Sequence, residues 1–133
     1  MNFEDQKIWD SIAEDWSGKR RRQIKEVMNL LEKTEGNVLD MACGSGRHFS
    51  AHVTHACDFS EIMLNIAKKN AVQQGFDIEI SQCSMEKTPY EDDFFNYVFC
   101  ISSLHCMDEI DQQLALKEIF RILKPGAMLV ISV

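Results

Sequence analysis

The sequence has 133 residues, which is enough for one domain with a single core and too few for two. Hydrophobic residues make up 45% of the chain and charged residues 26%, as in ordinary globular proteins, and the formal net charge is -7. That charge argues against a large non-specific nucleic-acid surface. No apolar stretch approaches the roughly 20 residues of a membrane-spanning helix.

The cysteine pattern predicts free thiols. The chain has five cysteines, and no two of them form a C-x-x-C pair: Cys43, Cys57, Cys83, Cys100 and Cys106. An odd number without such pairs is atypical of a disulfide framework or a zinc site. The N-terminus also lacks the basic start and apolar run of a secretory signal. We therefore expect a reducing, cytoplasmic compartment.

Two helices are predicted to open the chain. Residues 4–16 place Ile8, Ile12 and Trp16 on one helical face, and a second amphipathic helix is predicted over residues 22–33. We expect this N-terminal segment, residues 1–34, to pack over the binding site of a domain that spans residues 1–133.

From residue 38 onward, apolar strands alternate with helices. Strands are predicted over residues 38–43, 52–57, 77–82, 94–101 and 127–133. Helices are predicted from the Ser60 cap to Gly75 and over residues 109–123, and Lys124-Pro125-Gly126 predicts a turn. This alternation indicates an α/β fold with a mainly parallel sheet and helices on both faces. Because the chain stops inside an apolar strand, we expect that it lacks the C-terminal strands of the sheet.

A turn of small residues follows the first predicted strand, in the segment VLDMACGSG (residues 38–46). Small residues allow positive φ angles and let the backbone approach a ligand closely. In parallel sheets, ligands bind at the carboxyl ends of the strands. Asp58 ends the next strand, where a carboxylate can accept hydrogen bonds from both ribose hydroxyls. The alternative is that Asp58 is a charge at the start of the helix capped by Ser60.

Four segments in this order resemble the class I S-adenosylmethionine-dependent methyltransferases, a family with a Rossmann-like fold. They are VLDMACGSG, CDFS, TPYEDDFFNYVFCISSLH and EIFRILKPGAMLVIS. The resemblance covers almost the whole chain and implies S-adenosylmethionine as the cofactor. A dinucleotide-binding dehydrogenase is the competing interpretation of the glycine turn, but its G-x-G-x-x-G pattern requires a glycine where Phe49 stands.

The resemblance implies roles for eleven residues in cofactor binding: Asp40, Ala42, Cys43, Gly44, Gly46, Asp58, Phe59, Cys83, Ser84, Met85 and Ile101. Asp40 orients the glycine turn, whose backbone contacts the methionine part, while Asp58 holds the ribose. Residues 83–85 lie at the adenine edge, and Ile101 offers its carbonyl to the cofactor's amino group.

Two positions depart from the family pattern. Many relatives have an acidic residue at position 83 that binds the adenine amino group, and Cys83 cannot do so well, so backbone groups of Ser84 and Met85 must replace it. Asn96 stands where an aspartate is common, and we expect this change to affect loop packing more than chemistry.

A closer resemblance is to the wobble-uridine tRNA carboxymethyl methyltransferases. The segment IWDSIAEDWSGKR is similar to that family's Y-x-x-I-A-x-x-F-S-x-x-R pattern, the segment between Gly46 and Asp58 is short, and SSLHC stands where relatives carry two histidines. This resemblance implies esterification of a carboxymethyl group on tRNA uridine and a small zinc-binding activator protein as partner. A small-molecule or protein methyltransferase, or a catalytically silent binding subunit, remain as alternatives.

Two residues are the candidates for catalysis. Arg20, in the basic run of residues 19–22, would bind the substrate carboxylate or a phosphate through its planar guanidinium, and His105 would orient the substrate. The alternatives are a surface charge for Arg20 and a polar cap on the sheet for His105. A loop and a strand separate His48, His52 and His55, so we expect no metal site.

Overall fold

A computed structural model describes residues 3–19 and 22–133 of the chain. Its centre is a parallel sheet of five strands in the order β3-β2-β1-β4-β5. The strands are β1 (Val38–Met41), β2 (His55–Asp58), β3 (Glu79–Gln82), β4 (Phe95–Ile101) and β5 (Leu123–Ser132). The α/β Rossmann-like fold class expected from the sequence is confirmed.

The sheet reverses its direction of winding at β1, which lies between β2 and β4. Met41 at the end of β1 is in register with Cys57 in β2 and Cys100 in β4. The carboxyl ends of these three strands therefore lie level with one another. A reversal of this kind opens a crevice at that edge of the sheet, which is where such folds bind ligands.

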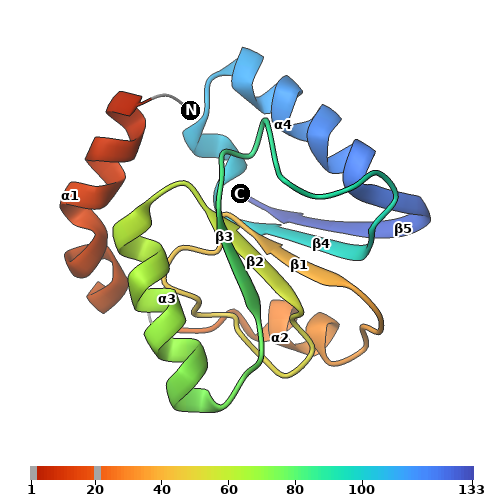
Figure 1. Cartoon of the computed structure of the whole chain (residues 1–133), viewed down its shortest axis with the longest axis horizontal. Coiled ribbons are helices and arrows are strands. Elements are labelled where there is room, and N and C mark those ends of the chain that lie inside the picture. The colour runs from red at the N-terminus through yellow and green to blue at the C-terminus, as the bar shows by residue number, and fades with distance from the viewer. Residues whose placement is uncertain (1–2, 20–21) are drawn as a thin grey trace.

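Helices cover both faces of the sheet (Figure 1). They are α1 (Phe3–Lys19), α2 (Lys25–Leu31), α3 (Glu61–Gln74), α4 (Glu109–Ile122) and the short 3-10 helix η1 (Leu104–Cys106). One core cluster joins α2 and α3 to the sheet through residues such as Leu31 and Ala67. The other joins α4 to the opposite face through Ala115 and Ile119. Helix α1 lies beside α3.

The ends of α3 match the sequence prediction. Ser60 is the N-cap, and its hydroxyl accepts a hydrogen bond from the Met63 N–H at 3.2 Å. Gly75 ends the helix with a φ of 73°, a left-handed conformation that glycine adopts without a steric penalty. Both signals are local, and no tertiary contact overrides them.

Strand β5 differs from the prediction. It begins directly after α4, and the predicted turn at residues 124–126 lies inside the strand as an irregularity. Phe95 pairs with Leu123, but Tyr97 pairs with Met128, so extra residues of β5 bulge out of the ladder. Gly126 allows this bulge with a φ of 77°. The Lys-Pro-Gly segment therefore bends the strand instead of separating it from the helix.

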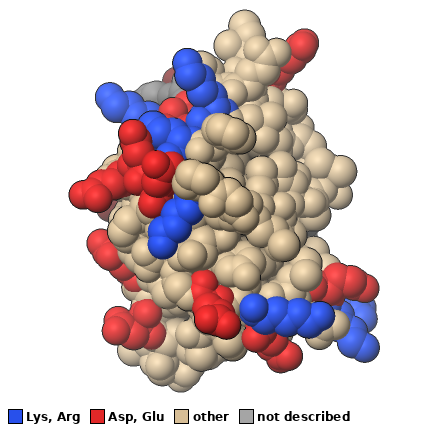
Figure 2. All heavy atoms as spheres, turned by 90° about the vertical axis from the view of Figure 1, so that its right-hand side faces the viewer, with Lys and Arg blue, Asp and Glu red and all other residues tan. Residues whose placement is uncertain are grey.

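The edge of the sheet at β5 leaves apolar side chains exposed, among them Met128, Ile131 and Val133. Figure 2 shows that this side of the molecule carries a broad area without charged residues. In the described part of the chain, no helix combines the length and apolar character needed to cross a membrane.

We expect Gly36→Ala to destabilise the protein by about 1–3 kcal/mol. Gly36 has a φ of 77°, and an added Cβ would lie 2.4 Å from the Asn96 Oδ1 atom, which accepts the Asn37 N–H. Urea unfolding would measure this loss. Gly18→Ala is the matched control, because no atom lies within 4 Å of its added Cβ. An equal effect of both substitutions would contradict this account.

Candidate active site

A pocket lies at the carboxyl ends of β1, β2 and β4 and encloses about 910 Å³, its open mouth included. The three strand ends contribute Ala42, Asp58 and Ile101 to its wall, and α1 contributes Trp9 and Trp16. The pocket therefore occupies the crevice that the sheet topology creates.

The turn after β1 needs small residues at three positions. Ala42, Gly44 and Gly46 all have positive φ angles, of 54°, 56° and 82°. A Cβ on Gly44 would meet no atom within 4 Å, so the backbone there is open to a ligand. A Cβ on Gly46 would lie 2.5 Å from the ring of Phe49, a buried residue of the core cluster that includes α2 and α3. Gly44 thus leaves room for a ligand to approach the backbone, whereas Gly46 leaves room for the Phe49 ring.

Asp58 joins the turn to the second strand. Its Oδ2 atom accepts a hydrogen bond from the Gly44 N–H and its Oδ1 atom from the Ser60 N–H, both at 2.9 Å. Burial raises the pKa of Asp58, although these backbone donors oppose that shift. Each carboxylate oxygen can still accept another donor. Asp58 therefore supports the helix start and can also hold hydroxyl groups of a ligand.

Asp40 places a second carboxyl group in the pocket wall. Burial and, to a smaller extent, the neighbouring Asp58 raise its pKa to about 7, while Arg47 acts in the opposite direction. A buried carboxyl group and a half-buried one at one end of a pocket produce a negative potential. This end of the pocket therefore favours a ligand that carries positive charge.

The wall contributed by α1 is aromatic. The Trp9 and Trp16 rings meet edge to face, with centroids 5.4 Å apart and an interplanar angle of 83°. Asp10 accepts a hydrogen bond from the Ser60 hydroxyl, and the Ser17 hydroxyl donates to the Met63 sulfur at 3.6 Å, so both contacts hold α1 on α3. The spacing of seven residues places both tryptophans on one helical face, but the sequence did not indicate which wall they form.

Arg47 and His48 also line the pocket. The His48 Nε2 atom accepts the Ile24 N–H at 3.0 Å, so a neutral ring carries its proton on Nδ1. Burial and the nearby Arg47 lower the pKa of His48 to about 4. His48 is therefore neutral at pH 7 and a weak base. The sequence pattern singles out His48 only as a possible metal ligand and gives no signal for Arg47.

Most residues expected to bind the cofactor lie in the pocket wall: Asp40, Ala42, Cys43, Gly44, Asp58, Phe59, Cys83, Met85 and Ile101. The wall does not include Gly46 and Ser84. Further wall residues, Ser102, Ser103 and Cys106, come from the segment after β4.

The two proposed catalytic residues have different positions. Arg20 lies outside the described residues. His105 is exposed on η1 and is not part of the pocket wall, because this short helix turns Leu104 into the core and Cys106 toward the pocket. Within the described residues, no three His, Cys, Asp or Glu side chains gather as a metal site.

The sheet order, the glycine turn and the carboxylate at the end of β2 together define a nucleoside-binding α/β domain. Comparison with known proteins gives the family. Residues 38–126 match the family model described as a methyltransferase domain, and the chain belongs to this family.

Curated relatives agree with this assignment. The ubiquinone/menaquinone biosynthesis C-methyltransferase UbiE of Photorhabdus laumondii is 30% identical over 142 aligned positions, which cover 98% of this chain and 50% of that protein. A demethylmenaquinone methyltransferase of Listeria monocytogenes is 31% identical, with 79% of this chain and 48% of that protein covered. The chain thus spans about half the length of the curated relatives it matches.

Solved structures share the fold. An S-adenosyl-L-methionine-dependent methyltransferase of Methanococcus maripaludis aligns with a TM-score of 0.73 at 25% identity, covering 97% of this chain and 62% of that chain. The [4+2]-cyclase SpnF aligns with a TM-score of 0.79 at 22% identity, covering 96% and 58%, which is a likeness of fold alone. Family and fold confirm S-adenosylmethionine as the expected cofactor.

The residues present fit this cofactor. S-adenosylmethionine carries a sulfonium and an ammonium group, which suit the negative end of the pocket at Asp40 and Asp58. The spare lone pairs of Asp58 suit ribose hydroxyls, and the open backbone at Gly44 leaves room beside them. Phe59, Cys83 and Met85 supply the apolar surface that an adenine ring requires.

We expect the affinity for S-adenosylmethionine to rise about tenfold between pH 6 and pH 8. The free protein holds a proton on Asp40 below pH 7 or so, and a bound cation favours the ionised form, so binding releases that proton. Calorimetric titration in buffers of different ionisation enthalpy would measure both effects.

Asp40→Asn is the control for this prediction, because it removes the titrating group and nearly preserves the shape. The raised pKa of Asp40 also makes the stability of the free protein depend on pH, and stability falls as the pH rises, whereas affinity increases. The stabilisation from the Asp40 proton is complete below the ordinary pKa of 3.8 and is lost as the pH rises through about 7. Equal affinity of the unmodified protein at both pH values would contradict this role of Asp40.

Proposed function

We propose that the chain is the catalytic domain of an S-adenosylmethionine-dependent methyltransferase that esterifies a carboxylate, the carboxymethyl group of wobble uridine in tRNA. One observation favours a carboxylate: the described pocket residues suit an acceptor that is already ionised. His48 is a weak base with a pKa of about 4, and the pKa of Asp40, about 7 in the free protein, would fall beside a bound cation. A carboxylate is ionised at neutral pH and needs no base.

The pocket residues then promote methyl transfer by positioning the acceptor beside the cofactor and by excluding water from the pocket. The bound cofactor supplies an electrophilic methyl group on its sulfonium. Trp9 and Trp16 close the pocket from α1 and present aromatic surface of the kind on which nucleobases stack. Arg47 brings positive charge to the same pocket and suits an anionic acceptor. We propose Arg20 and His105 as further contacts of the substrate.

The names of the relatives support a second candidate, methylation of a ring carbon in a quinol. A phenolic hydroxyl has a pKa of about 10, so this reaction requires a base to ionise it. Asp40 in the pocket wall has a pKa of about 7, and a bound cation would lower it. The aromatic wall suits a quinol ring, but His48 and a cation-bound Asp40 are too weak as bases to ionise its hydroxyl.

Incubation with cofactor that carries a labelled methyl group distinguishes these acceptors. The protein would be given total tRNA or a demethylated quinol, each with and without the small zinc-binding activator protein that we propose as partner. We expect label in tRNA that mild alkali releases, because alkali hydrolyses methyl esters. Alkali-stable label in the quinol would reject the tRNA proposal, and label in neither would favour a silent binding subunit.

Cofactor binding itself should depend on Asp58. We expect Asp58→Ala to weaken S-adenosylmethionine binding by about tenfold to a hundredfold, because a charged acceptor of hydrogen bonds is lost. Calorimetry would measure the affinity, and circular dichroism would verify the fold, since Asp58 also bonds Gly44 and Ser60. The exposed Asp77→Ala is the control for the loss of one negative charge. Undiminished binding by the Asp58 variant would refute the ribose role.

A further inference from the structure

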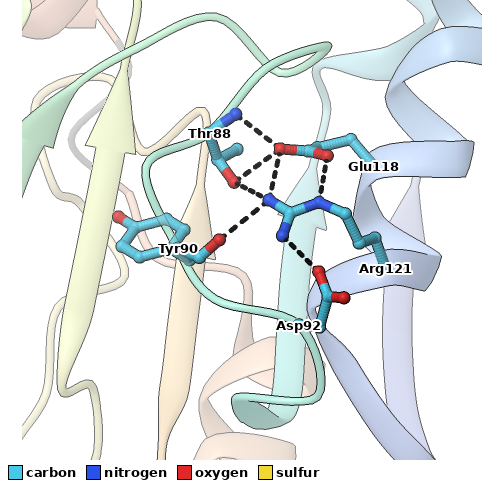
Figure 3. Close-up of polar contacts among 5 residues, drawn as sticks. All are labelled: Thr88, Tyr90, Asp92, Glu118 and Arg121. Atoms are coloured by element: carbon cyan, nitrogen blue, oxygen red, sulfur yellow. Dashed lines mark hydrogen bonds and ion pairs between the residues drawn. The ribbon is translucent and has the colours of Figure 1, made fainter.

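The loop between β3 and β4 is fastened to α4 by a cluster of charged and polar groups (Figure 3). Glu118 on α4 accepts hydrogen bonds from the Thr88 N–H at 2.6 Å and from the Thr88 hydroxyl at 2.8 Å. Arg121, one turn further along α4, donates to the Tyr90 carbonyl at 2.8 Å and to the Asp92 carboxylate at 2.7 Å. Three points of the loop are thus held by two side chains.

The two side chains on α4 also hold each other. Arg121 donates from Nε to Glu118 Oε1 at 2.7 Å and from Nη2 to Glu118 Oε2 at 2.9 Å, a bidentate pair. The Glu118 side chain is only 10% exposed. The bond from Arg121 and the donors of Thr88 lower the pKa of Glu118 to about 2, so it stays ionised. A lysine cannot reproduce this planar fork.

The other end of the loop forms the pocket wall. The Cys83 N–H donates to the Asp58 carbonyl at 3.1 Å, and the Lys87 N–H donates to the Ser84 carbonyl at 3.4 Å, which closes a tight turn. Thr88 follows this turn directly. Met85 at its tip is 4% exposed, lines the pocket and belongs to the core cluster of α4. The turn is therefore held by β2 on one side and by Glu118 on the other.

We propose that Glu118 and Arg121 are positioning residues for adenine recognition, a role that rests on the proposed use of S-adenosylmethionine. The Cys83 thiol is a weak hydrogen-bond acceptor, so on this proposal the selection of adenine depends on main-chain groups of the turn that carries Met85, which lines the pocket. Main-chain groups select a base only where the chain is held in place. The fork of Arg121 and Glu118 provides that hold from the far side of the loop.

Two ligands that differ at the adenine amino group test this role. S-adenosylhomocysteine carries the amino group, and S-inosylhomocysteine has a carbonyl in its place. Calorimetric titration would be performed on the unmodified protein, Arg121→Lys, Glu118→Gln and the control Lys117→Met, an exposed position on the same helix. We expect both cluster variants to lose about tenfold in affinity for the adenosine ligand and no more than about twofold for the inosine ligand. The control should retain both affinities.

Asp92→Asn is a milder variant that we expect to fold even if the other two do not. The Asp92 side chain is 74% exposed, and the substitution changes its ion pair with Arg121. It should show the same pattern at smaller amplitude. Hydrogen exchange at residues 84–88 should quicken in the variants while the melting temperature of Asp92→Asn stays close to that of the unmodified protein.

An equal loss for both ligands, or unchanged discrimination between them, would overturn the positioning role and leave the cluster a purely structural one. If the unmodified protein binds neither ligand, the proposed cofactor site itself fails and the positioning role fails with it. Binding by the unmodified protein with unchanged variants would reject only the positioning role.

Discussion

A buried and a half-buried carboxyl group at neighbouring strand ends, Asp40 and Asp58, are the constraint on which this domain depends. Asp40 pairs in register with Ala56, and Asp58 ends the same strand as Ala56, so the sheet itself brings both acids to one edge. Burial of a charged carboxylate costs several kcal/mol unless it is compensated. Backbone donors compensate Asp58 in part, and the pKa of Asp40 shifts to about 7 instead. A cationic ligand offsets this unfavourable electrostatics, so binding and fold are coupled at this edge.

The rest of the pocket follows from that edge. The turn at Gly44 brings its N–H to Asp58, which ties β1 to β2 and leaves the backbone open on the ligand side. The same carboxylate supports the Ser60 N–H, and Ser60 in turn bonds Asp10 of α1. A chain of contacts therefore runs from the cofactor end of the pocket to the helix that carries the aromatic wall. On the proposed role of Asp58, cofactor binding and the packing of α1 on α3 share these residues.

Sequence reasoning succeeded where the signal is local. The glycine turn, Asp58 and the caps at Ser60 and Gly75 depend on neighbouring residues, and the structure places them as expected. It was incomplete where distant segments meet. Seven-residue spacing puts Trp9 and Trp16 on one face, but only packing against α3 aims that face at the pocket. The outward direction of His105 depends on the short helix η1, which pattern reasoning does not resolve.

The segments TPYEDDFF and EIFRILKPG identified the family without revealing why their polar residues occur together. Their partnership depends on the fork that joins Arg121 to Glu118 and carries the loop at Thr88 and Tyr90. This fork also gives a physical reason why Cys83 is tolerated at the adenine edge. Hydrogen bonds from the main chain do not depend on the side chain at position 83, but they do depend on where the main chain is held. On the proposed positioning role, adenine recognition thus depends on a charged pair outside the pocket instead of on a side chain inside it.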